Sequence, residues 1–149
     1  MSYRRLPLDN VAMNKPEKPK WDIIGLTFAT KGIKHVFVTE RNLKIHIVIA
    51  VLVALAAIFF SLSVFETIII IFAISIVIFA EIVNTSIETI VDLICIDVLK
   101  DKLDESEYNA KAKLSKDIAA GAVLITAVMS AIVGILVFLP KIIDRIASI

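Results

Sequence analysis

The chain has 149 residues, of which 58% are hydrophobic, and its formal net charge is +1. This balance excludes a globally basic nucleic-acid-binding protein, and the length and apolar content indicate one small helical membrane domain. Cys95 is the single cysteine, so an intrachain disulfide is excluded too.

The N-terminal part divides into a tail and a first helix. Residues 1–20 hold all but one of the four prolines and show no periodic apolar pattern, so we expect a basic, disordered tail without chemistry. Residues 21–39 mix apolar residues with two lysines and a histidine, which is too polar to cross a bilayer. The segment is typical of an amphipathic helix in the membrane interface with Trp21 at headgroup depth, although a soluble amphipathic helix is an alternative.

Three later segments are long and apolar enough to span a bilayer. We expect these spans at residues 45–63, 67–95 and 118–139, the last closed by Pro140. The second span has no Gly or Pro and is long enough to carry its polar C-terminal half to one interface or beyond it. The predicted fold is therefore an all-α membrane protein, in which residues 21–149 supply three transmembrane helices and one interfacial helix.

The positive charges predict how these spans are oriented. Lys and Arg number nine in residues 1–44, five in residues 96–117 and two after Pro140, with none between the first two spans. We therefore expect a multi-pass protein of the plasma membrane. The positive-inside rule places its N-terminus and its 96–117 loop on the cytoplasmic side. The polar half of the second span faces the same compartment, where ATP is available.

A polar stripe interrupts the second span. It consists of Glu81, Asn84, Glu88 and Asp92. At helical spacing these residues lie within about 80° of one another, so they share one face. Carboxylates in hydrocarbon are costly unless they face a bundle interior, water or a cation, and Mg²⁺ prefers such oxygen ligands. Polar contacts that hold helices together are the alternative, weakened by the lack of Lys or Arg on this face.

Further polar residues are predicted at the same membrane surface. Glu40 lies between the interfacial helix and the first span, and Lys116 with Asp117 opens the third span. A lysine at a helix start opposes the helix dipole, which points to an anionic partner such as a phosphate. A snorkelling lysine and a solvated glutamate are the plainer explanations.

Three stretches carry a resemblance to a known family. "TERNLKIHI", "AEIVNTSIETIVD" and "KDIAAGAVLI" resemble the small integral-membrane prokaryotic diacylglycerol kinases, in particular their Gram-positive undecaprenol kinase branch. The resemblance covers about residues 28–141. It implies a homotrimer with active sites shared between protomers, a requirement for ATP and Mg²⁺, and undecaprenol as the lipid substrate, with diacylglycerol as the alternative.

The same resemblance implies roles for the residues of the stripe. Glu81 would be the general base that takes the proton from the lipid hydroxyl. Glu40 and Glu88 would hold the metal ion on ATP, with Asn84 close by. A carboxylate at membrane depth suits this role because phosphoryl transfer needs positioning and a nearby proton acceptor more than covalent chemistry.

The nucleotide contacts implied by the resemblance come from the region before the third span. Lys116 would contact the phosphates, Asp117 the region of the nucleotide base, and Asp92 would support the site. The chain departs from the family pattern in residues 96–115, a loop roughly ten residues longer than usual by comparison with the family. The glycines are too scattered to form a phosphate loop of the Walker type.

Two functions of other classes compete with the kinase. A small ion or proton transporter could relay a cation through Glu81 and Glu88. Against it, the acids cluster in one half of the membrane, and the other two spans carry no charged residue at mid-depth. A non-catalytic assembly protein held together by the stripe would leave Glu40 and Lys116 without a role.

Overall fold

The structure, a computed structural model, describes residues 25–95 and 105–148. Within these residues it contains helices and no strand, which confirms the predicted all-α class. The helices are α1 (Leu26–Thr39), α2 (Arg41–Phe59), α3 (Val64–Leu93) and α4 (Glu105–Ala147). The predictions for the tail, for Trp21 and for residues 96–104 of the 96–115 loop fall outside the described residues, and the division into tail and membrane domain stays a prediction.

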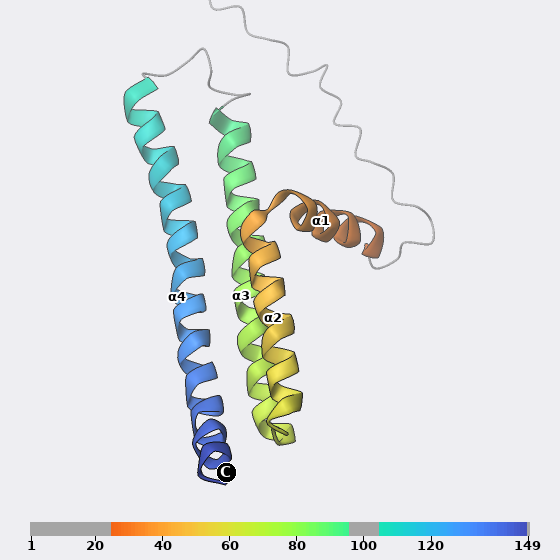
Figure 1. The fold of residues 1–149 in the computed structure, drawn as a ribbon. Helices are drawn as coiled ribbons and strands as arrows, with labels where there is room; N and C mark the ends of the chain where they lie inside the picture. Colours follow the sequence, from red (N-terminus) through yellow and green to blue (C-terminus); the bar gives the residue numbers. More distant parts are fainter. Residues whose placement is uncertain (1–24, 96–104, 149) are drawn as a thin grey trace, which may run out of the picture.

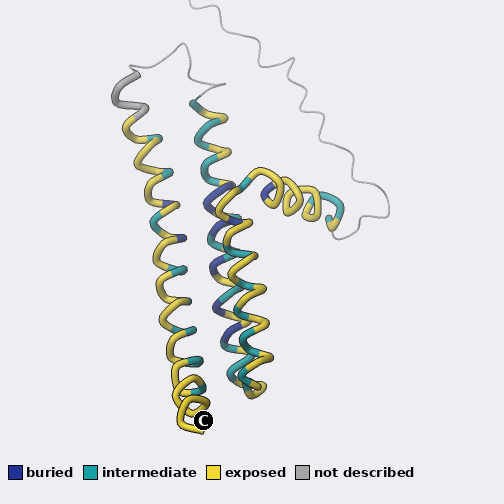
Figure 2. Tube along the Cα trace, viewed as in Figure 1, coloured by how far each residue is buried: buried dark blue, intermediate teal, exposed yellow. Residues whose placement is uncertain are grey.

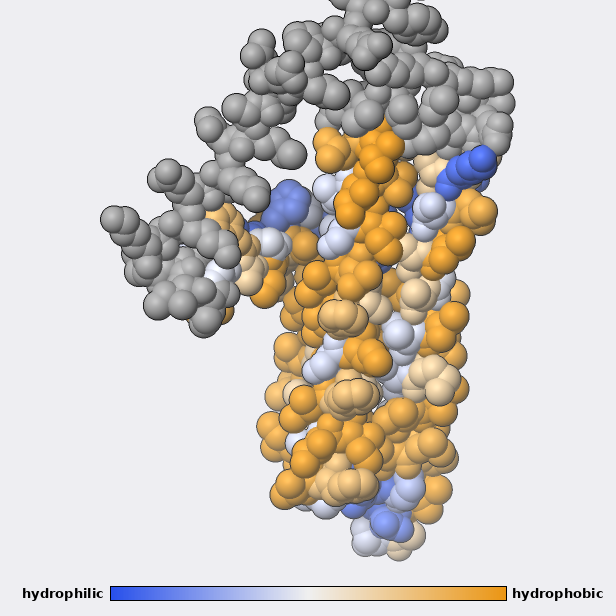
Figure 3. Space-filling view, turned by 180° about the vertical axis from the view of Figure 1, so that it is seen from behind, coloured by the Kyte–Doolittle hydropathy of each residue, from blue (hydrophilic) through white to orange (hydrophobic). Residues whose placement is uncertain are grey.

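Three of the helices are long and apolar enough to cross a membrane. These segments are Arg41–Phe59, Val64–Leu93 and Ala110–Ala147. Helices α2, α3 and α4 run side by side, whereas α1 projects sideways from the bundle at the level where α2 begins (Figure 1). Seen from behind, the bundle is hydrophobic over most of its length, and its strongly hydrophilic groups lie near the two ends (Figure 3). This surface suits contact with lipid chains along the middle of the bundle.

The first span ends earlier than the predicted residue 63. Helix α2 stops at Phe59, and Ser61 adopts the left-handed conformation with φ 50°. The Ser61 amide donates to the Ile58 carbonyl at 3.1 Å and the Leu62 amide to the Ala57 carbonyl at 3.0 Å, the pattern of a Schellman motif. A serine replaces the usual glycine of that motif, so the sequence carried no signal for the stop.

The second span begins earlier than the predicted residue 67, because a capping box starts it. The Ser63 hydroxyl accepts from the Glu66 amide at 3.3 Å, and the Ser63 amide donates to the Glu66 carboxylate at 2.7 Å. Both bonds satisfy amides that the first helical turn leaves unpaired. With 30 residues, α3 is about 45 Å long, which exceeds the hydrocarbon core of a bilayer of about 30 Å.

The prediction that Pro140 closes the third span was wrong. Helix α4 runs through Pro140 to Ala147, and it already begins at Glu105 instead of residue 118. Proline removes one backbone hydrogen bond, which membrane helices tolerate where neighbouring groups support the chain. The adjacent Lys141 ammonium pairs with the Glu66 carboxylate of α3 at 3.1 Å and holds this part of α4 against the bundle.

The buried core of the bundle follows one face of α3. Helix α3 packs most extensively against α4 and also contacts α2 and α1. Its buried residues are Ile70, Ala73, Val77, Glu81, Asn84 and Thr85. Figure 2 shows them as a dark band along α3. The band is apolar in its first half and polar in its second, so the core leads directly from hydrocarbon packing to the predicted site.

Candidate active site

Glu81 is the most deeply buried large side chain of the described residues. Only 1% of its surface is exposed, although it is an acid on a helix that spans the membrane. The Thr85 hydroxyl, also buried, donates to the Glu81 backbone carbonyl at 3.0 Å. No Lys or Arg of the part that the structure describes pairs with the carboxylate. Such burial is costly for a structural residue, since acids are rarely buried without a cationic partner.

Polar residues of α2 surround this carboxylate. The Asn42 side chain lies within hydrogen-bonding reach of it, and His46, Glu40 and Glu88 lie close enough to act on it electrostatically. Asn42 and His46 are four residues apart, so they share the face of α2 that looks toward α3. This arrangement brings three elements together around Glu81: the α1–α2 junction, the first turns of α2 and the second half of α3.

Asn84 lies between Glu81 and the next carboxylate along α3, and it contacts the latter. Its Nδ2 amide donates to Glu88 Oε1 at 3.0 Å. Its Oδ1 atom is buried and has no hydrogen-bond partner among the residues that the structure describes. A buried acceptor without a partner costs about 1–3 kcal/mol of stability, which indicates that it serves something other than packing.

An ion pair joins α3 to α4 nearer the end of the bundle. The Lys116 ammonium donates to Asp92 Oδ1 at 2.5 Å. The side chain of Lys116 is 34% exposed and that of Asp92 50% exposed, so the pair faces water. Asp117 is exposed beside it. This is a region that a water-borne anion can reach.

Glu40 occupies the break between the two N-terminal helices. It has an extended conformation, with φ −85° and ψ 118°, and its amide donates to the Val36 carbonyl at 2.8 Å. Its side chain makes no capping bond to α2 and accepts only a long bond of 3.4 Å from the Thr39 hydroxyl. The Glu40 carboxylate is therefore half-buried beside the bundle and does not cap α2.

These groups do not form a metal site by themselves. Among the described residues, no three His, Cys, Asp or Glu side chains gather closely enough to hold a metal ion. Glu88 and the unpartnered Asn84 Oδ1 offer oxygen atoms on one face of α3. Mg²⁺ usually takes one or two carboxylates and completes its shell with water and substrate phosphates, so this sparse oxygen set fits an ion that arrives with a nucleotide.

The structure brings most of the predicted site residues to one end of the bundle. Glu40 and Glu88 both lie close enough to Glu81 to act on it electrostatically, and Asp92 pairs with Lys116. Sequence reasoning assigned no role to Asn42 or to His46. The signal that could have found both is their spacing of four residues directly after Glu40, which puts them on one face at the start of a span.

Comparisons with known proteins identify the family. The family model described as prokaryotic diacylglycerol kinase matches residues 27–138. The undecaprenol kinase of Bacillus subtilis is 39% identical over 113 residues, which are 76% of this chain and 84% of that protein. The diacylglycerol kinase of Synechocystis sp. is 30% identical over 145 residues, which are 93% of this chain and 78% of that protein. No solved structure matches the chain significantly. The chain belongs to the prokaryotic diacylglycerol kinase family.

Proposed function

We propose that the protein is a membrane lipid kinase that transfers the γ-phosphoryl group of MgATP to the primary hydroxyl of undecaprenol and yields undecaprenyl phosphate. The observation that carries this proposal is the burial of Glu81, an acid without a cationic partner, on a membrane-spanning helix. A carboxylate in that position can meet a hydroxyl that arrives from the bilayer. The family and the similarity to an undecaprenol kinase support the same activity.

The reaction needs one proton acceptor and an in-line approach. The lipid hydroxyl oxygen forms a bond to the γ-phosphorus, the bond from that phosphorus to the β-phosphate bridging oxygen breaks, and ADP leaves. Glu81 accepts the hydroxyl proton. A positioned general base contributes about 10²–10⁴-fold to rate, and the remainder of the acceleration comes from placement and charge neutralisation.

The nucleotide enters as its magnesium complex, a substrate for this protein. Glu88 and Glu40 provide carboxylates toward the metal ion, and Asn84 offers its unpartnered oxygen nearby. The metal ion neutralises phosphate charge when it is bound. Together, these three residues position the nucleotide and keep the terminal phosphate of the nucleotide beside Glu81.

Lys116 contacts the phosphates of the nucleotide in this proposal. Its side chain is one-third exposed, and its ammonium already lies against Asp92, which holds the long side chain in place. Asp117 lies next to the nucleotide base. A lysine is a strong point-charge ligand for phosphate, and its position on the water-exposed part of the bundle suits a soluble substrate.

The orientation and assembly are part of the proposal. The charge distribution supports a cytoplasmic active site in the plasma membrane. A homotrimer with shared active sites fits the large exposed apolar faces of α2, α3 and α4, which are available to lipid and to neighbouring copies alike.

Undecaprenol is the favoured acceptor because, of the two relatives described above, the undecaprenol kinase has the higher sequence identity to this chain. Diacylglycerol is the alternative within the same chemistry. Both acceptors present a primary hydroxyl at the membrane surface.

The test is transfer of labelled phosphate from γ-labelled ATP by purified protein in mixed micelles with Mg²⁺. Undecaprenol and diacylglycerol are offered in parallel at equal surface concentration. Faster labelling of undecaprenol supports the proposal, and faster labelling of diacylglycerol changes the substrate but keeps the mechanism. If a folded protein labels neither lipid, the kinase proposal is refuted.

A further inference from the structure

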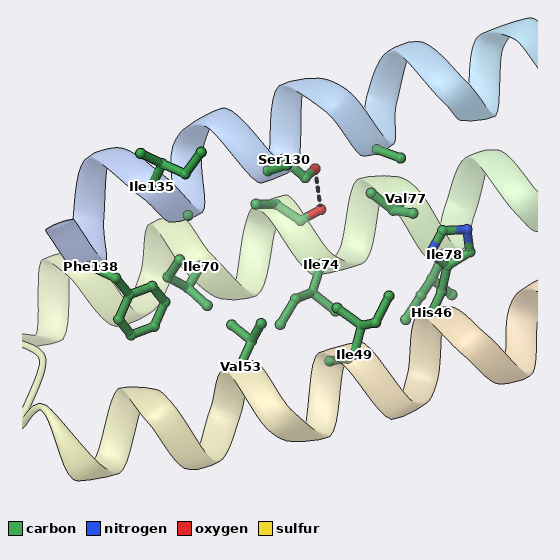
Figure 4. A pocket seen from close by; sticks show the side chains of 15 residues that line it. His46, Ile49, Val53, Ile70, Ile74, Val77, Ile78, Ser130, Ile135 and Phe138 are labelled. Atoms are coloured by element: carbon green, nitrogen blue, oxygen red, sulfur yellow. Dashed lines mark hydrogen bonds between the residues drawn. The ribbon is translucent and has the colours of Figure 1, made fainter.

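A groove runs between the three membrane helices below Glu81. It has a volume of about 330 Å³ and is lined by residues of α2, α3 and α4. His46 lies at one end of the groove and Phe138 at the other, with Val53, Ile70 and Ile74 between them (Figure 4). The α3 part of the wall extends from Ile70 to Ile78, which corresponds to about 12 Å along the helix.

One polar side chain of the groove is available to bind an occupant. Only His46 and Ser130 of its lining residues have polar side chains. The Ser130 hydroxyl is already used, because it donates to the Ala73 carbonyl at 2.9 Å across the α3–α4 interface (Figure 4). The half-buried imidazole of His46 therefore stands alone at one end of a hydrocarbon surface. An occupant that matches this surface has a small polar end and an apolar body.

The polar end of the groove adjoins the candidate base. Ile70, Ala73 and Val77 line the groove and belong to the same buried face of α3 that continues into Glu81. Glu81 follows Val77 by four residues, or about 6 Å along the helix. His46 acts electrostatically on the Glu81 carboxylate. A molecule in the groove thus has its polar end one helical turn from Glu81.

We propose that this groove binds the first part of the hydrocarbon chain of the acceptor alcohol, with the hydroxyl held past His46 at Glu81. The inference rests on the proposed lipid kinase activity and deepens it. A volume of 330 Å³ is near the lower end of the range of about 300–1,000 Å³ for ligand pockets. That volume suits a single prenyl chain better than the two acyl chains of diacylglycerol.

Gly134 provides a way to fill the groove without distorting its walls. It lines the groove on α4, and a Cβ atom added there would meet no atom within 4 Å. It follows Ser130 by about one turn toward Phe138, so it lies in the half of the groove away from His46. A larger side chain at this position obstructs the far half and leaves the end near Glu81 open.

The experiment measures phosphorylation of three prenols of increasing length, geraniol, geranylgeraniol and undecaprenol, by wild-type protein and by Gly134→Leu. We expect KM for the two longer alcohols to rise about tenfold or more in Gly134→Leu, since steric exclusion from an apolar pocket changes specificity by about 10–200-fold. The kinetics with geraniol should stay near wild type, because a short chain does not reach Gly134.

Further variants separate the parts of the groove. Ala50→Leu narrows it from α2 and provides an independent test of obstruction if Gly134→Leu does not fold. His46→Leu should lower kcat/KM for all three prenols alike, because it removes the polar group next to the hydroxyl. Leu136→Phe is the matched control on α4, because this side chain is 69% exposed and does not line the groove, so its chain-length profile should match wild type.

Two outcomes overturn the inference alone. One is a Gly134→Leu profile parallel to wild type for all three prenols, which would show that no acceptor chain lies there. The other is an equal loss with every prenol together with a changed oligomer size in light scattering, which would show that a second copy fills the groove. If wild-type protein phosphorylates no prenol, the proposed function fails as well.

Discussion

The burial of Asn84 lowers the stability of the fold, and packing does not explain why the residue is there. Its Oδ1 atom is buried without a partner while its Nδ2 atom holds Glu88. Replacement by leucine removes the unsatisfied oxygen and leaves Glu88, which is only half-buried, accessible to water. We therefore predict that Asn84→Leu lowers kcat/KM at least about tenfold, as expected for loss of a hydrogen bond to a charged group, without a matching loss of stability.

The measurement pairs transfer kinetics with thermal unfolding in the same detergent. The unfolding midpoint of Asn84→Leu should stay within about 3 °C of wild type. Ser86→Ala serves as control, because Ser86 is exposed on the same helix and its hydroxyl donates only to the Ile82 carbonyl of its own helix. A large drop in the midpoint with unchanged kinetics would instead assign Asn84 to the core.

Residue-level prediction succeeded where helical periodicity alone decides the outcome. The spacing of Glu81, Asn84 and Glu88 predicted a shared face, and the structure buries the first two of them. The contact of His46 with this face was missed, because it depends on the register between α2 and α3. Register is set by the turn that joins the two helices, so the spacing of Asn42 and His46 could show that they share a face of α2 but not which residues of α3 this face meets.

Helices α3 and α4 are joined by an ion pair at each end of their interface. Lys116 pairs with Asp92 at 2.5 Å, and Lys141 pairs with Glu66 at 3.1 Å at the opposite end. Partly exposed pairs of this kind contribute about 0–1 kcal/mol, so neither one determines the stability of the bundle. If Lys116 also binds phosphate, the two lysines differ in function although their structural roles are alike.

We predict that Lys116→Met raises KM for ATP about tenfold to a hundredfold, since a hydrogen bond to a charged group contributes about 1.5–3 kcal/mol. Lys141→Met removes the same kind of ion pair at the other end and should leave KM for ATP unchanged. The comparison uses initial rates at varied ATP and saturating lipid. Equal changes in both variants would mean that Lys116 acts only as a helix tie.

The helix ends were harder to predict than the helices. Apolar length was sufficient to find three spans, but the stop at Phe59 depends on Ser61 in a left-handed conformation, which glycine usually adopts. The capping box of Ser63 and Glu66 was readable in principle. The continuation of α4 through Pro140 could not be predicted from the sequence, because it depends on support from neighbouring groups such as the Lys141–Glu66 pair.

Among the described residues, far more large apolar side chains are exposed than are buried. The buried apolar residues of the described chain are Val36, Leu43, Ile70, Ala73, Val77, Ala119 and Val123. A core of this size is too small to stabilise the chain in water, so lipid, or neighbouring copies in the proposed homotrimer, must cover most of the helix faces. The polar end of the bundle then lies at one membrane surface.

The native cysteine offers a direct test of which surface this is. Cys95 lies two residues beyond the end of α3, and Ser148 lies exposed near the end of α4 at the other side of the bundle. We predict that a membrane-impermeant maleimide labels Cys95 only after cells are permeabilised. In a Cys95→Ser, Ser148→Cys variant the label should react with intact cells. The reverse pattern would contradict a cytoplasmic active site.

The most direct test of the account is phosphate transfer to undecaprenol by Glu81→Gln. Glu66→Gln is measured beside it as the same change on the same helix, where glutamine retains the capping interaction. The account predicts that Glu81→Gln loses at least about 100-fold in kcat while it stays folded, because a general base is removed, and that Glu66→Gln stays near wild type. A folded Glu81→Gln protein with wild-type kcat would contradict the account.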